Sequence, residues 1–247
     1  MIISVPFVPM LFLSLPTSKE SPDHYGTEHP AINDNRYKCC TAFEMKRKDQ
    51  LGIIPEQFKG QALEVEASSV SDTETAAQSL YELAKKKLFS VNDWHKVVDG
   101  LTARFQIVDQ DGNEVSRKVN KGDYLRINIP GPGNKEGDGY DWVVVEDLKE
   151  INKEDFQSAG FRVRPTENPF GKKNETAHFY SNETTSSFVI TRENVTVVSW
   201  IVDRNMKPNT ESESMMDKLR DVMVGVSGIA GFSKVQWQGL ADGLLEI

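Results

Sequence analysis

The C-terminal stretch 210–247, TESESMMDKLRDVMVGVSGIAGFSKVQWQGLADGLLEI, carries the strongest structural signal in the chain. Its apolar residues recur broadly at steps of three and four, which is the spacing of one face of an α-helix. Thr210 and Glu213 form a capping-box pair at its start. The sequence therefore predicts a long amphipathic helix that closes the core of a domain.

Three glycines, Gly225, Gly228 and Gly231, fall inside this predicted helix. Each glycine costs about 1 kcal/mol relative to alanine in a helix interior, so their presence needs a compensating reason. Close packing against a neighbouring backbone is the commoner reason, and room for a ligand is the other. We expect any internal cavity to lie against residues 225–232.

The segments before the helix favour an α+β domain. Leu63, Val65 and Ala67 alternate with glutamates, which predicts a half-buried strand. A helix should follow to about Leu88, opened by a capping box at Ser71. Further strands are expected at 105–107, 125–129, 140–145, 161–163, 176–180, 185–191 and 195–202. Their short, turn-rich links predict six or seven antiparallel strands rather than a parallel doubly wound sheet.

The 247-residue chain is 38% hydrophobic and 27% charged, as is typical of a globular protein. Residues 1–16 are apolar, but Pro6 and Pro9 interrupt them and they are too short to span a bilayer as a helix. Residues 17–41 are polar and lack periodicity. We predict a disordered or poorly ordered extension over residues 1–59 and one domain over residues 60–247, with Met45 as a second possible start.

The charge balance argues against two classes of partner. The net charge is −8, from 29 basic and 37 acidic residues, and the acidic excess lies after Lys59. An acidic domain repels both nucleic acid and anionic membrane surfaces. The only cysteines, Cys39 and Cys40, are adjacent and offer no disulfide framework. We therefore expect no nucleic-acid partner, no membrane insertion and a cytoplasmic location, with secretion through residues 1–16 as the alternative.

No motif for a metal, a cofactor or catalysis is found. His24, His29 and the two cysteines lack zinc-ligand spacing, and Asp109–Asn113 lacks the features of a calcium loop. The glycine-rich segment 131–139 is followed by neither Lys-Ser/Thr nor a helix. We expect no metal, no cofactor and no catalytic residue, which favours a protein that is not an enzyme.

The order of the predicted elements resembles a known family. A strand and helix over 61–88, Trp94 soon after, a run of antiparallel strands and one long C-terminal helix resemble the helix-grip fold of the START-like superfamily (SRPBCC). The resemblance implies a sheet curled around the last helix and an apolar cavity between them. It also implies non-catalytic binding of a small hydrophobic or amphipathic ligand.

Under this resemblance, His178 and Tyr180 share a segment from which they could orient a ligand hydroxyl or carbonyl. The expected ligand-binding residues are Trp142, His178, Tyr180, Phe188, Trp200, Met223, Gly228 and Phe232.

Two other functions stay open. One is a cyclase- or hydratase-like enzyme on the same fold, in which His178, Tyr180 or Asp141 polarises the ligand. The other is a structural or interaction protein with a filled core. Residues 143–145 and 195–201 are apolar at successive positions, as burial of both sheet faces in a dimer would require. Both a monomer and a homodimer are compatible with the sequence.

Overall fold

Seven strands form one antiparallel sheet in the computed structural model, which describes residues 49–98, 103–129, 137–171, 176–209 and 229–247. The order across the sheet is β1-β7-β6-β5-β4-β3-β2, so the first and last strands pair and the others follow the chain as a meander. The strands are β1 Gln61–Val70, β2 Arg104–Val108, β3 Tyr124–Asn128, β4 Asp141–Asn152, β5 Phe156–Pro165, β6 Thr185–Glu193 and β7 Thr196–Met206.

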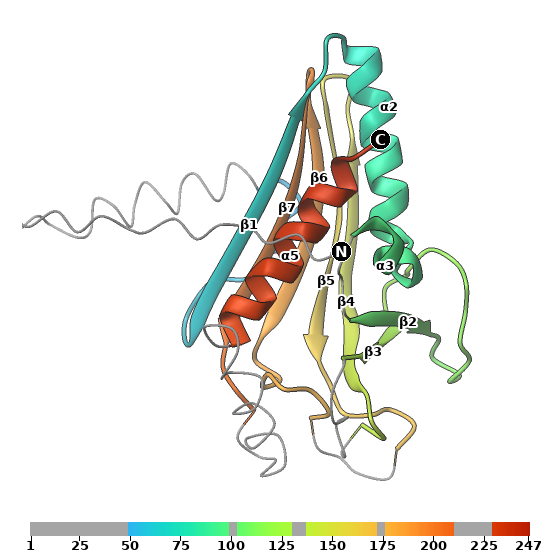
Figure 1. The fold of residues 1–247 in the computed structure, drawn as a ribbon, viewed down its shortest axis with the longest axis vertical. Helices are drawn as coiled ribbons and strands as arrows, with labels where there is room; N and C mark the ends of the chain where they lie inside the picture. The colour runs from blue at the N-terminus through green and yellow to red at the C-terminus, as the bar shows by residue number, and fades with distance from the viewer. Residues whose placement is uncertain (1–48, 99–102, 130–136, 172–175, 210–228) are drawn as a thin grey trace, which may run out of the picture. The chain divides into compact units, whose positions relative to one another are not determined.

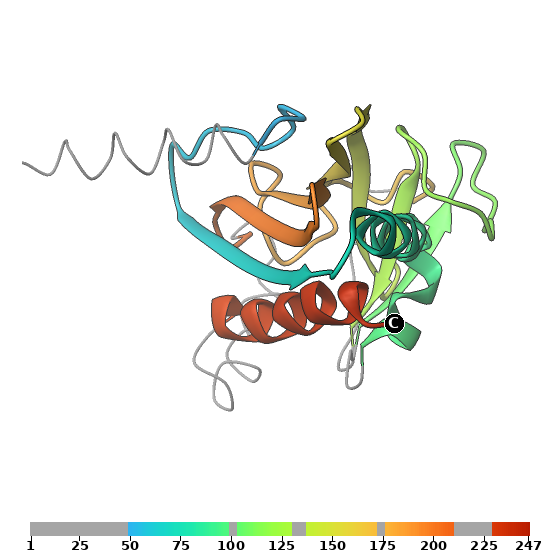
Figure 2. The same ribbon diagram turned by 90° about the horizontal axis from the view of Figure 1, so that it is seen from above.

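Helices cover one face of this sheet. They are α2 Glu74–Phe89, the short 3-10 turn η1 Val91–Asp93, α3 Trp94–Val97 and α5 Ile229–Leu245. The sheet curves around α5, which runs along β1 and β7, while α2 packs on β6 (Figures 1 and 2). The predicted α+β helix-grip architecture is thus confirmed. No helix among the described residues is long and apolar enough to cross a membrane.

The ends of α2 are fixed by specific hydrogen bonds. Its N-cap is Thr73, whose Oγ1 accepts from the amide of Ala76 at 3.1 Å, so the capping box predicted at Ser71 and Glu74 is wrong and a simple N-cap lies two residues later. At the other end, Lys87 Nζ donates to the carbonyls of Gly243 (3.0 Å) and Glu246 (2.6 Å). A cation is favourable at the C-terminal end of α5, and this contact joins the two helices.

Two predicted elements differ from the structure. Only Ile229–Leu245 of the predicted C-terminal helix is described, and the part from Thr210 to residue 228 lies outside the described residues. The predicted strand at 176–180 is wrong, because this segment makes only the isolated bridges Glu167–Thr176 and Tyr180–Pro208. Both edges of β5 and β6 are already paired. The backbone of the segment is instead held by Asn209 Nδ2, which donates to the carbonyls of Thr176 and His178.

The main core lies between the helices and the inner face of the sheet. Trp94 is 1% exposed, and its ring centre lies 5.0 Å from Phe188 and 6.1 Å from Phe161. Its indole Nε1–H donates to the carbonyl of Leu88 at 3.1 Å, which satisfies its one polar atom. Trp94 therefore ties the end of α2 to the centre of the sheet.

The outer face of the sheet is covered by the chain that precedes β1. Leu51 and Ile53 pack on Val189, Trp200 and Val202, and Ile53 is fully buried. The carbonyl of Ile53 accepts hydrogen bonds from Arg162 Nη1 (2.8 Å) and Ser187 Oγ (3.4 Å). Buried residues of the domain thus begin at Leu51, ahead of the boundary predicted at residue 60. This cover also accounts for the successive apolar positions in β7 without a partner chain.

We expect Ile53→Ala to lower the free energy of unfolding by about 2–5 kcal/mol, because it removes buried methyl groups and leaves a cavity. Urea denaturation would measure the change. Phe58→Ala is the control, since Phe58 is 70% exposed and its truncation should stay within about 0.5 kcal/mol of the parent protein. Equal effects of the two substitutions would show that residues 49–54 do not belong to the cooperative core.

Candidate functional site

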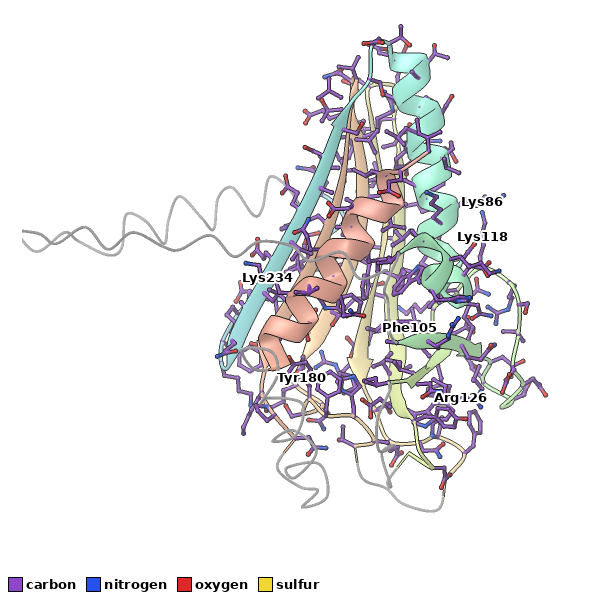
Figure 3. All side chains as sticks on the ribbon, in the orientation of Figure 1. Lys86, Phe105, Lys118, Arg126, Tyr180 and Lys234 are labelled. Carbon is purple, nitrogen blue, oxygen red and sulfur yellow. The ribbon has the colours of Figure 1, made fainter. Side chains whose placement is uncertain are left out.

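A cavity of about 80 Å³ lies between the inner face of the sheet, α3 and α5. Each of the strands β2 to β7 contributes side chains at inward-facing positions, and the helices close the other side. In Figure 3 the labelled Tyr180 lies beside the N-terminal part of α5, and Phe105 lies on β2. The lining residues are Trp94, Ala103, Phe105, Leu125, Ile127, Ile129, Val143, Val163, His178, Phe179, Tyr180, Ser186, Phe188, Asp203, Ser233, Gln236 and Trp237.

Asp203 forms the polar end of this otherwise apolar cavity. It faces inward from β7, directly opposite Ser186 on β6, and is 2% exposed. Trp237 Nε1–H on α5 donates to Asp203 Oδ2 at 2.9 Å. Oδ1 accepts no hydrogen bond of proper geometry from the described residues. One oxygen of a buried carboxyl group is therefore available to an occupant of the cavity.

Burial raises the pKa of Asp203 to about 6, because the low-dielectric interior disfavours the ionised form. The Ser186 hydroxyl, the Trp237 indole and the charge of Arg204 act in the opposite direction and limit the rise. At neutral pH the carboxyl group is therefore still mainly ionised.

Tyr180, Ser233 and His178 add neutral polar groups. The hydroxyl of Tyr180 lies 3.4 Å from Ser233 Oγ, and burial together with the nearby Asp203 raises the pKa of Tyr180. His178 Nδ1 accepts from the amide of Tyr180 at 3.0 Å, and burial lowers the pKa of His178 to about 3. Because Nδ1 is an acceptor, the neutral imidazole carries its proton on Nε2.

Asp203 is the one lining residue expected to be charged at neutral pH, since the described lining contains no Lys or Arg. The next residue, Arg204, has the opposite orientation in the strand. Its guanidinium pairs with Glu64 on the outer face. The cavity therefore combines aromatic and aliphatic walls with a single negative charge.

Three of the sequence-predicted site residues, His178, Tyr180 and Phe188, line this cavity. Trp200 does not, because it is one position out of phase with the inward-facing Ile201 and packs against Leu51 and Ile53 on the outer face.

Trp142 is also outside the lining. It packs with Val108 and Ala177, and its Nε1–H donates to the carbonyl of Gly137 at 3.2 Å. Asp141, a candidate for the enzyme alternative, is buried opposite Ile127 and does not line the cavity. Met223 and Gly228 lie outside the described residues, and Phe232 belongs to α5 but its side chain is not described.

The sequence analysis missed Asp203, Ser233 and Trp237 as site residues. A signal for Asp203 was present, because an acidic residue two positions after the apolar Ile201 should share its buried face. No comparable signal marks Ser233, which becomes a site residue only because α5 brings it to Tyr180.

No family model matches this chain, and no curated protein does. Among solved structures, a hypothetical protein from Helicobacter pylori is 10% identical, with a TM-score of 0.44 over 76% of this chain and 87% of that chain. Norcoclaurine synthase from Thalictrum flavum is 8% identical, with a TM-score of 0.34 over 92% and 96% of the two chains. The major latex-like protein 151 from Panax ginseng is 10% identical, with a TM-score of 0.30 over 73% and 99%. The fold assignment rests on the strand order and on α5.

The raised pKa of Asp203 has a consequence for stability. Its folded value of about 6 lies above the ordinary value of 3.8, so the folded protein binds this proton more tightly than the unfolded chain does. The stability that the group contributes is full below about pH 4 and is lost as the pH rises through about 6. At about 1.4 kcal/mol per pKa unit, the loss is about 3 kcal/mol.

Asp203→Asn should therefore be more stable than the parent protein by up to about 3 kcal/mol above about pH 7, and the difference should disappear towards about pH 4. The asparagine keeps an oxygen that can accept from Trp237. Chemical denaturation of both proteins across this pH range would measure the difference. The lowered pKa of His178 makes stability fall with decreasing pH in both proteins, so it cancels from the difference. Parallel pH profiles would contradict the prediction.

Proposed function

We propose that this protein binds a small hydrophobic or amphipathic molecule in the cavity between the sheet and α5, without transforming it. The observation that supports the proposal is a space with apolar walls inside an otherwise packed core. Protein interiors are normally filled to the packing density of organic crystals, so an unfilled space lowers the stability of the free protein. Ligand binding would compensate for that loss.

The size of the cavity favours a small ligand. A single water needs about 10–15 Å³ of such space, so about 80 Å³ accommodates several waters or a molecule the size of one ring. Water gains few hydrogen bonds from walls such as Phe105, Leu125 and Val163. An apolar group of the ligand would displace that water favourably, and burying it would supply most of the binding free energy.

The polar end would give the ligand one orientation. The hydroxyls of Tyr180 and Ser233 lie together, and Asp203 lies close enough to influence the pKa of Tyr180. A ligand with one polar group would place it here and leave its apolar body against the aromatic walls. Neither His178 nor Tyr180 has a pKa near neutrality, so neither is matched to exchange a proton with Asp203, whose pKa is about 6.

The substitution Val163→Phe tests the cavity directly. Val163 lines it from β5, and a phenylalanine ring would fill the space that a ligand needs. We expect 4-fluorotoluene, a one-ring apolar probe, to bind the parent protein in ¹⁹F NMR titrations. Its affinity should fall by about tenfold or more in Val163→Phe.

The matched control is Val198→Phe, which adds the same ring to the partly buried outer face of β7. It should leave the affinity for 4-fluorotoluene within about threefold of the parent value, because the added ring lies on the outer face of the sheet, away from the cavity. A threefold change in affinity corresponds to less than about 1 kcal/mol. The proposal fails if the parent protein does not bind the probe or if both variants bind it equally well.

A further inference from the structure

The cavity contains an acceptor to which the described residues make no hydrogen bond of proper geometry. Asp203 lines the cavity and is 2% exposed, Trp237 binds its Oδ2, and the opposing Ser186 hydroxyl lies close enough to lower its pKa. Oδ1 has no hydrogen-bond partner among the described residues. A buried carboxylate oxygen without a donor costs free energy, and a ligand that donates to it would remove that cost.

The charge of Asp203 is also uncompensated on the cavity side. The described lining contains no Lys or Arg, and Arg204 is paired with Glu64 on the other face of the sheet. His178 cannot supply a positive charge at neutral pH, because its pKa is lowered to about 3. The described part of the cavity wall therefore leaves the charge complement to an occupant.

We propose that the ligand is a small primary amine with a body about the size of one ring, whose ammonium group donates to Asp203 Oδ1. The inference rests on the proposed function, since it takes the cavity as the binding site and adds the chemical class of the ligand. The apolar body lies against residues such as Phe105 and Phe188. The ammonium group lies at the end formed by Asp203, Tyr180 and Ser233.

An amine fits this end better than a neutral or an acidic group. A ligand hydroxyl would donate to Oδ1 but would leave a buried negative charge, whereas an ammonium group donates and neutralises the charge. Its further N–H groups can donate to the hydroxyl oxygens of Tyr180 and Ser233, which lie 3.4 Å apart. A carboxylate ligand would be repelled by Asp203.

The inference also predicts how binding depends on pH. The ammonium requires the ionised form of Asp203, so the affinity should fall about tenfold for each pH unit below the folded pKa of about 6. The other groups facing the site do not titrate in this range. The pKa of His178 is lowered to about 3, and the pKa of Tyr180 is raised above its ordinary value.

The experiment compares three probes on the full chain by ¹⁹F NMR titration: 4-fluorobenzylamine, 4-fluorobenzyl alcohol and 4-fluorotoluene. At about pH 7.5 we expect the amine to bind about tenfold or more tightly than the alcohol, because a charge-assisted hydrogen bond is stronger than a neutral one. Asp203→Asn should remove that preference, because it removes the charge that the ammonium group neutralises. Asp242→Asn removes the same charge from an exposed position on α5 and should leave the preference and the affinity for 4-fluorotoluene within about threefold of the parent values.

Each outcome bears on one of the two proposals. If 4-fluorotoluene binds but the amine has no advantage over the alcohol, or keeps its advantage in Asp203→Asn, the amine inference is overturned and cavity binding stands. If no probe binds the parent protein, the proposed function fails and the inference fails with it. Should Asp203→Asn not fold, the parent protein alone decides, because an amine affinity unchanged between about pH 7 and about pH 5 would overturn the inference.

Discussion

The alternation of side chains along β7 is the constraint on which both faces of the domain depend. Ile201 and Asp203 point towards the helices, while Trp200 and Val202 point to the other side. Because successive residues of a strand face opposite sides, the same eleven-residue strand serves the main core, the outer cluster and the cavity. A slip of one residue in its pairing with β6 would turn Asp203 to the outer face and remove its carboxyl group from the cavity.

The two faces of the sheet are covered in different ways, the outer face by the chain before β1 and the inner face by helices. On the outer face, a short segment of irregular chain contributes the cover, since Leu51 and Ile53 pack on three residues of β6 and β7. On the inner face, the sheet curves around α5 (Figure 2), and larger side chains fill the space between the sheet and the helices. Trp94 fills the middle of that space through its contacts with Phe161 and Phe188. Beside Trp94, inward-facing side chains of β2 to β7 leave the cavity.

The sequence predicted the elements well and the site only in part. Alternation identified the sheet strands, and three- and four-residue spacing identified α2 and α5, because these periodicities follow directly from local backbone geometry. The segment 176–180 alternates like a strand, yet it is held by the side chain of Asn209, by two isolated bridges and by the Trp142 amide, which donates to the carbonyl of Ala177. A local sequence pattern cannot reveal these partners. Trp200 was assigned to the cavity because it is apolar and lies in a strand expected to form the cavity wall. Its face was decided by the cover from Leu51 and Ile53, which the sequence analysis had placed outside the domain.

Asp203 shows how a site residue can be recognised by its cost to the fold. An inward-facing position on β7 would accept an apolar side chain, as Ile201 does two residues earlier, and a carboxyl group there must be desolvated. Among the described residues, the Trp237 indole makes one hydrogen bond of proper geometry, the Ser186 hydroxyl lies opposite, and the Arg204 guanidinium is on the other face with Glu64. A group needed only for stability would be expected to have both oxygens satisfied, because a half-satisfied buried carboxylate is less favourable than an apolar residue. The lack of a donor to Oδ1 in the described part of the chain, together with the cavity beside it, therefore supports the proposal that the stability lost at Asp203 is recovered when a ligand binds.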